Sequence, residues 1–217
     1  RNVEFYSGAF PANRGNALSS VLDFQQIDGN KEKMKYRATI GASDLALTLD
    51  GPLGDKTSVV FSARRSYLQF LFQVIGLPFL PTYNDVQFKV KSRIDEKNEI
   101  TFIGLGALDQ FALNLDANET EEQRYILGYL PVNEQWNYTL GAVYKHYQDK
   151  SYHTLVVSRN HLNNSAYKYE DNDESDPSKK ILEYGSREQE NKLRIENTYR
   201  KNDFKLNLGV NFENVVY

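Results

Sequence analysis

The sequence predicts an all-β fold, an antiparallel up-and-down sheet of the kind that forms transmembrane β-barrels. Three observations carry this prediction. Apolar and polar residues alternate along most of the chain. Tight turns alternate with longer connections between the expected strands, and many of the 15 tyrosines lie near the ends of these strands. The clearest alternation runs over residues 204–212, which predicts a strand with one apolar and one polar face.

In several expected strands the polar face is charged. A water-soluble sandwich turns its polar face to solvent, whereas a membrane barrel turns it to the lumen and gives the apolar face to lipid. Alternation is the same in both cases, so the aromatic positions and the loop lengths are what favour the barrel. The residues expected to line the lumen are Gln87, Lys89, Lys91, Arg93, Lys192, Arg194 and Glu196.

Composition excludes some other classes of protein. No segment approaches the ~20 consecutive apolar residues of a membrane helix, because the most apolar stretch, 68–80, is interrupted by polar residues, Gly and Pro. A helical membrane protein is therefore excluded, whereas a β-barrel is not. The chain has no cysteine, which excludes disulfides and cysteine-ligated metals, and its net charge of -3 gives no sign of nucleic-acid binding.

The first 30 residues differ from the rest. Residues 3–6 and 21–26 are expected to be strands on either side of an irregular segment rich in Gly, Asn, Pro and Ser. The run Asp28-Gly29-Asn30 signals a turn, and charged residues follow it directly. A domain boundary is expected near residue 30.

Beyond this boundary we expect about eleven strands. Three of them, around Ile100, Leu127 and Val156, show no clear apolar face. Tight turns are expected at 51–55, 95–98 and 201–203, an apolar loop at 68–81 and a long acidic loop at 170–190. The strands are expected at 34–42, 43–50, 57–67, 85–94, 99–108, 124–130, 135–147, 152–159, 166–169, 192–199 and 204–212.

Candidate reactive sites are few. The carboxylates between Glu170 and Asp176 could hold calcium, but their spacing lacks the EF-hand pattern, and a solvated acidic loop is the other interpretation. His146, His153 and His161 are spread over different segments, so no metal site is predicted. No nucleophile triad, phosphate loop or convincing carboxylate pair is present, and we expect neither an enzyme nor a cofactor.

Residues 8–24 carry a more specific pattern. Arg14-Gly15, the small residues that follow and the hydrophobic end from Val21 to Phe24 resemble the end of the plug domain of TonB-dependent outer-membrane receptors. The turn at 51–55 is similar to the first periplasmic turn of their barrels. Residues 62–68 with 77–79 look like the Bacteroidetes branch of the family. The resemblance extends over nearly the whole chain, and its plug block is the most specific part.

This resemblance implies an internal piece of a transporter. Residues 1–30 would be the C-terminal part of the plug, and 31–217 the first part of a barrel of about 22 strands. Its function would be active transport of a siderophore, a glycan or another nutrient across the bacterial outer membrane. Its partners would be outer-membrane lipid, the inner-membrane TonB complex acting through the missing N-terminal part of the plug, and a surface lipoprotein.

Within the resemblance, the ligand or the plug movement would involve Arg14, Asn16 and Phe79. Arg14 could pair with a barrel carboxylate such as Glu196 or Glu213, or be a solvated loop residue. The apolar loop around Phe79 could touch a ligand at the barrel mouth, or pack on the plug or at the lipid interface. Two other functions stay open: a passive or structural barrel without a movable plug, and a soluble β-rich binding module.

Overall fold

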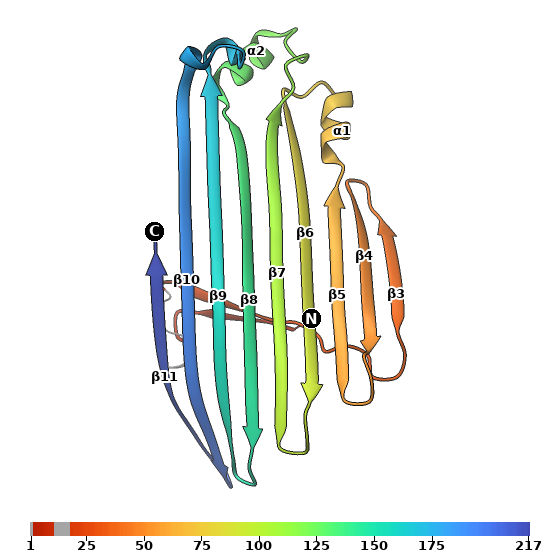
Figure 1. The fold of residues 1–217 in the computed structure, drawn as a ribbon, viewed down its shortest axis with the longest axis vertical. Coiled ribbons are helices and arrows are strands. Elements are labelled where there is room, and N and C mark those ends of the chain that lie inside the picture. Colours follow the sequence, from red (N-terminus) through yellow and green to blue (C-terminus); the bar gives the residue numbers. More distant parts are fainter. Residues whose placement is uncertain (1, 11–17) are drawn as a thin grey trace.

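A computed structural model describes residues 2–10 and 18–217. In this part of the chain the strands form two antiparallel sheets (Figure 1). The small sheet is a hairpin of β1 (Asn2–Ser7) and β2 (Ser20–Gln25). The large sheet has nine strands in the order β11 to β3, so each strand pairs with its neighbours in the sequence. The predicted all-β, up-and-down fold is confirmed, and the sheet is open, as in part of a barrel.

The strands of the large sheet lengthen along the chain from β3 to β10, and two α-helices and two short 3-10 helices connect some of them. The strands are β3 (Lys35–Ile40), β4 (Asp44–Pro52), β5 (Thr57–Ser66), β6 (Phe79–Arg93), β7 (Asn98–Leu113), β8 (Val132–Tyr147), β9 (Ser151–Tyr169), β10 (Lys180–Lys201) and β11 (Phe204–Val216). The helices are α1 (Leu68–Val74), α2 (Glu121–Tyr129), η1 (Glu170–Asn172) and η2 (Pro177–Lys179).

Tight turns lie at one end of the sheet and the helices at the other (Figure 1). The backbone N–H of Leu53 donates to the carbonyl of Thr57 at 2.8 Å, and that of Ile94 donates to Asn98 at 2.9 Å. Asn202, with φ of 52°, makes the turn into β11. The turns expected at 51–55, 95–98 and 201–203 are confirmed. Apart from the short connection 41–43, the opposite end carries the long connections, which is the asymmetry of bacterial barrels.

The strand expected at 124–130 is wrong, because α2 occupies this segment. Thr120 and Gln123 form a capping box: the Thr120 hydroxyl accepts from the Gln123 backbone at 3.1 Å, and the Gln123 side chain accepts from the Thr120 backbone at 2.9 Å. At the other end of the helix, the ammonium of Lys168 donates to the carbonyls of Leu127 and Leu130. Leu127 thus showed no strand face because it belongs to a helix.

Replacing Thr120 with alanine should destabilise α2 by about 1 kcal/mol, since one cap of the helix is lost. We expect amide hydrogen exchange over 121–129 to rise about fivefold, with exchange in β7 and β8 unchanged. Replacing Thr120 with serine keeps the hydroxyl and should leave exchange close to the wild-type rate. Equal exchange in the alanine and serine variants would show that the cap does not hold this helix.

Nine strands, rather than about eleven, follow residue 30. The strands expected at 152–159 and 166–169 are both part of β9, and the acidic loop ends at Lys179 because β10 begins at Lys180. Tyr184 pairs with Ala166 and Glu188 with Leu162, so the backbone ladder continues through 186–191, where every residue of β10 is polar. The apolar loop expected at 68–81 is also shorter, because α1 and the start of β6 take up most of it.

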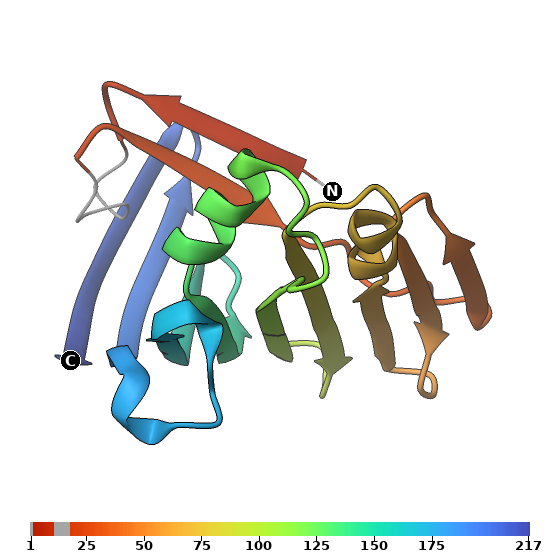
Figure 2. The same ribbon diagram turned by 90° about the horizontal axis from the view of Figure 1, so that it is seen from above.

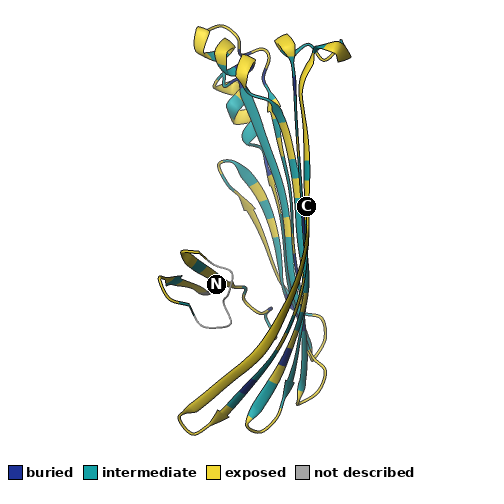
Figure 3. Cartoon of the chain, turned by 90° about the vertical axis from the view of Figure 1, so that its left-hand side faces the viewer, coloured by how far each residue is buried: buried dark blue, intermediate teal, exposed yellow. Residues whose placement is uncertain are grey.

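The large sheet is curved, and the β1–β2 hairpin lies on its concave side (Figures 2 and 3). None of the helices in residues 2–10 and 18–217 is long and apolar enough to cross a membrane.

Pairing register defines an apolar band on the convex face. Its members are neighbours from strand to strand, in the row Phe212, Leu193, Val157, Ala142, Phe102 and Val90. On β8 the band extends from Trp136 to Tyr144, whereas on β10 it extends from Leu193 to Tyr199, nearer the tight turns. The band therefore runs obliquely across the strands, as it would if tilted strands crossed a membrane.

Candidate functional site: the concave face and its docked segment

Residues 26–30, here called the docked segment, follow β2 and contact the concave face of the large sheet. The ammonium of Lys89 donates to the Gln26 carbonyl at 2.8 Å. The carboxylate of Asp28 lies 2.8 Å from the ammonium groups of both Lys89 and Lys91. The polar side of β6 is therefore the concave side.

The docked segment also approaches the backbone of β5. Gly29 is buried, and a Cβ added to it would lie 2.6 Å from the carbonyl oxygen of Val59 and 2.7 Å from its nitrogen. The backbone N–H of Asn30 donates to the Asp50 carboxylate at 2.6 Å. Only glycine permits this close approach, because any side chain would displace a strand backbone.

The lysines of β6 are matched by carboxylates from two elements. Lys89 is only 14% exposed, and Lys91 lies 3.3 Å from Glu99 of β7 in addition to Asp28. Partly buried charges need such partners, since an unpaired ammonium group would lose its hydration without compensation. The docked segment thus supplies Asp28 as a counterion to this part of the sheet.

Acidification should release the docked segment. Burial opposes ionisation of Asp28, but hydrogen bonds from Lys89 and Lys91 outweigh it and hold its pKa below its ordinary value of about 3.9. A carboxyl with a lowered pKa gives stability that is complete above the ordinary value and is lost as the pH falls through the lowered one. We expect pepsin to cleave next to Phe24 and Ile27 only below about pH 4.

The control for this prediction is Asp28→Asn, which cannot ionise. Measured relative to an unstructured peptide substrate at the same pH, which corrects for the pH dependence of pepsin itself, its docked segment should be cleaved at about the same rate throughout the acid range. Cleavage of the wild-type chain that, on this relative scale, did not change between pH 5 and pH 2 would contradict the role of the carboxylate.

A cavity of about 710 Å³ lies between the end of the hairpin and the sheet. Phe24, Gln25 and Gln26 line one side of it, and Arg64 and Asp85 are among the residues of the other. The Arg64 guanidinium donates to Asp85 at 2.7 Å, so these two charges neutralise each other. With amides, a paired charge and apolar side chains on its wall, this space can hold a polar solute by hydrogen bonding and contact.

The structure places all seven predicted lumen residues on one face of the sheet. Gln87, Lys89, Lys91 and Arg93 alternate along β6, and the pairing row from Lys89 leads through Ile103, Gly141 and Ser158 to Lys192. Arg194 and Glu196 share the side of Lys192 on β10. Lys192 lies 2.8 Å from Glu190 and 2.9 Å from Glu213. That these residues line a lumen stays a prediction.

The three other predicted residues do not contribute to this site in the same way. Arg14 and Asn16 lie outside the described residues. Phe79 begins β6, where its ring is 5.4 Å from the rings of both Phe72 and Phe111. It packs in an aromatic cluster of α1, β6 and β7, and a contact with a ligand stays a prediction.

Sequence reasoning missed the docked segment as a site. Asp28 and Gly29 were interpreted only as a turn signal, and Glu99 as a strand residue. The pairing of Asp28 with Lys89 and Lys91 joins segments about 60 residues apart, for which periodicity gives no signal.

Among residues 2–10 and 18–217, no group of three or more histidines or carboxylates is arranged to hold a metal ion. In the acidic loop, hydrogen bonds from Lys179 and Ser175 lower the pKa of Asp173 to about 2. The Lys179 ammonium lies 2.6 Å from this carboxylate, so the loop neutralises part of its own charge.

No protein-family model matches the chain, and no curated protein matches it. Solved structures of similar fold include two variants of the ferric enterobactin receptor from Pseudomonas aeruginosa. One is 14% identical, with a TM-score of 0.56 over 78% of this chain and 28% of that chain. The other is 13% identical, with a TM-score of 0.55 over 83% of this chain and 30% of that chain. The chain has the fold of part of such a receptor and spans less than a third of its length.

Proposed function

We propose that this chain is part of a TonB-dependent transporter of the bacterial outer membrane. Residues 1–30 would be the C-terminal part of the plug and 31–217 the first part of the barrel. The observation that supports this most is a curved meander with an apolar convex face and a polar concave face on which a separate N-terminal segment docks. The fold of the ferric enterobactin receptors supports the same proposal.

The attachment of the docked segment suits a part that moves. Its contacts with β6 are ion pairs and hydrogen bonds to side chains, whereas the strands of the sheet are joined by continuous backbone ladders. The shared carboxylate of Asp28 is 39% exposed, so water can reach it as the lysines separate from it. Pulling on the plug would therefore release this segment while the sheet stays folded.

The transported ligand is a nutrient such as a siderophore or a glycan, and the structures of similar fold, named as receptors for ferric enterobactin, favour the siderophore. The inner-membrane TonB complex would supply energy through the rest of the plug. Outer-membrane lipid would cover the convex face, and a surface lipoprotein would be a further partner at the loops.

The first test is the location and size of the native polypeptide. An antibody against residues 31–217 should detect a band in the outer-membrane fraction whose mobility changes on boiling, as for a folded barrel. The band should be several-fold heavier than 25.0 kDa, since the receptors of similar fold are nearly three times as long as this chain. A water-soluble band that is unchanged by boiling would contradict the proposal and favour a soluble binding module.

The second test concerns energy coupling. Cells that lack the gene should lose the ability to grow on low concentrations of one nutrient, with ferric enterobactin tested first, and cells that lack TonB should lose it as well. If uptake fails without the gene but persists without TonB, the protein is a passive barrel.

A further inference from the structure

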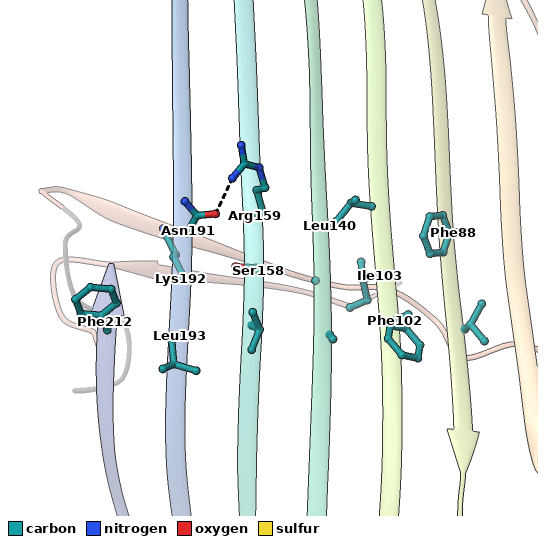
Figure 4. A pocket seen from close by; sticks show the side chains of 14 residues that line it. Phe88, Phe102, Ile103, Leu140, Ser158, Arg159, Asn191, Lys192, Leu193 and Phe212 are labelled. Carbon is teal, nitrogen blue, oxygen red and sulfur yellow. Dashed lines mark hydrogen bonds between the residues drawn. The ribbon is translucent and has the colours of Figure 1, made fainter. Parts of the chain in front are cut away.

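An apolar groove of about 910 Å³ lies on the convex face, turned away from the β1–β2 hairpin (Figure 4). Its side chains come from six strands, and small residues such as Ala142 separate larger ones. Phe88, Phe102 and Leu140 lie toward one end, and Leu193 and Phe212 toward the other (Figure 4). The groove is long and open, which suits a hydrocarbon chain rather than a compact solute.

Arg159 lines one side of this groove and places a positive charge there. Its Nε donates to the Tyr138 hydroxyl and its Nη1 to the Asn191 side chain, both at 3.1 Å (Figure 4 shows the second bond). Both partners are neutral, and no carboxylate of the described residues forms an ion pair with Arg159. Lys89 and Lys192 on the concave face, by contrast, have carboxylate partners. The guanidinium of Arg159 is half-buried beside apolar surface, and only two of its five N–H donors form the hydrogen bonds above. An anion would therefore stabilise its charge.

Aromatic side chains next to Arg159 indicate its depth in the membrane. The ring of His161 lies 4.4 Å from that of Trp136 and 5.4 Å from that of Tyr138, on the convex face. Trp and Tyr gather at the membrane–water interface, where lipid headgroups lie. Below Arg159 on β9, Val157 and Leu155 belong to the apolar band. Arg159 therefore lies at the upper edge of the band, toward the end with the long connections.

We propose that this face binds a lipid with a phosphate headgroup, the phosphate on Arg159 and an acyl chain in the groove. Arginine is suited to this role, since its guanidinium binds phosphate through two parallel hydrogen bonds. Tyr138 and Asn191 hold the guanidinium in place, and the groove gives the chain a defined path. The inference rests on the proposed function, in which the convex face meets outer-membrane lipid.

The test measures lipid binding to the whole polypeptide that contains this sequence, expressed with its natural flanking regions and purified in detergent. Lipid A with two phosphates is the probe, and native mass spectrometry counts the bound molecules. Arg159→Gln should weaken binding about tenfold, because a charge-assisted hydrogen bond is lost. The matched control is Arg187→Gln on β10, which removes an exposed arginine outside the groove and should leave binding within about twofold.

A second variant tests the groove itself. Ala142→Phe fills its floor without changing charge and should also weaken binding, whereas dephosphorylated lipid A should bind the wild-type and Arg159→Gln proteins equally. Unchanged binding by Arg159→Gln, or an equal loss in Arg187→Gln, would overturn the lipid site. The mobility change on boiling is recorded for every variant. A folded membrane barrel without lipid preference refutes only this inference, whereas a chain that folds in plain buffer refutes the proposed function.

Discussion

Replacing Phe102 with lysine is expected to lower the free energy of unfolding of the membrane-inserted protein by about 2–4 kcal/mol. Phe102 lies in the apolar row that runs from Phe212 to Val90, two strands away from Arg159, and it is 45% exposed on the convex face. A charge at this position would lie in hydrocarbon, where it has neither water nor a partner.

The neighbouring residue provides a matched control. Ile103 is on the same strand but on the concave face, in register with Lys89, so Ile103→Lys should cost less than about 1 kcal/mol, because the new charge meets water or the polar wall. Urea unfolding in lipid vesicles, followed by the fluorescence of the single tryptophan, Trp136, measures both variants. Equal losses at 102 and 103 would show that the two faces do not differ in environment. Unfolding of Phe102→Lys in plain buffer without lipid would favour a soluble module.

Replacing Gly29 with valine is expected to detach the docked segment from β5. The added Cβ would lie within 2.6–2.8 Å of backbone atoms of Val59, and a paired strand cannot move aside without losing ladder bonds on both sides. Overpacking of this kind costs about 1–3 kcal/mol. The docked state should therefore be populated about fivefold to a hundredfold less, with the sheet itself intact.

Hydrogen exchange over residues 26–30 measures this change. Exchange should rise in Gly29→Val while β6 and β7 keep their protection. Gly185→Val is the control, because a Cβ at Gly185 has no heavy atom within 4 Å. Protection of 26–30 that survives in Gly29→Val would show that the segment does not pass over β5 as described.

The sequence was sufficient to predict the repeating part of the fold. Alternation along β6, β8 and β11 and the turn signals at 51–55 and 95–98 are local, so each could be interpreted without its neighbours. The sequence analysis missed α2. Its capping box, Thr120 and Gln123, predicts the start of a helix, but residues 124–130 were interpreted as a strand although they show no apolar strand face. The first half of β10 was missed because Ile181 and Leu182 are adjacent and residues 186–191 are all polar, which removes the alternation that marks a strand.

The candidate site was predicted only in part. The spacing of Lys89 and Lys91 was enough to predict that both lie on the same face of the sheet, because residues two apart share a side of a strand. That Asp28 meets both lysines depends on the path from β2 to β3, which no local pattern encodes. The partners of Arg159 were missed for the same reason, since Tyr138 and Asn191 lie on adjoining strands about 20 to 30 residues away.

The meander has a consequence for the order of assembly. Because every strand of the large sheet pairs with its sequence neighbours, each new strand can close a short loop and extend the sheet from the previous hairpin, at a small cost in chain entropy. The contact of Asp28 with Lys89 and Lys91 is different, for it spans about 60 residues and needs β5 and β6 already in place. The β1–β2 hairpin therefore precedes the large sheet in the sequence but reaches its position only after β5 and β6 have formed downstream of it.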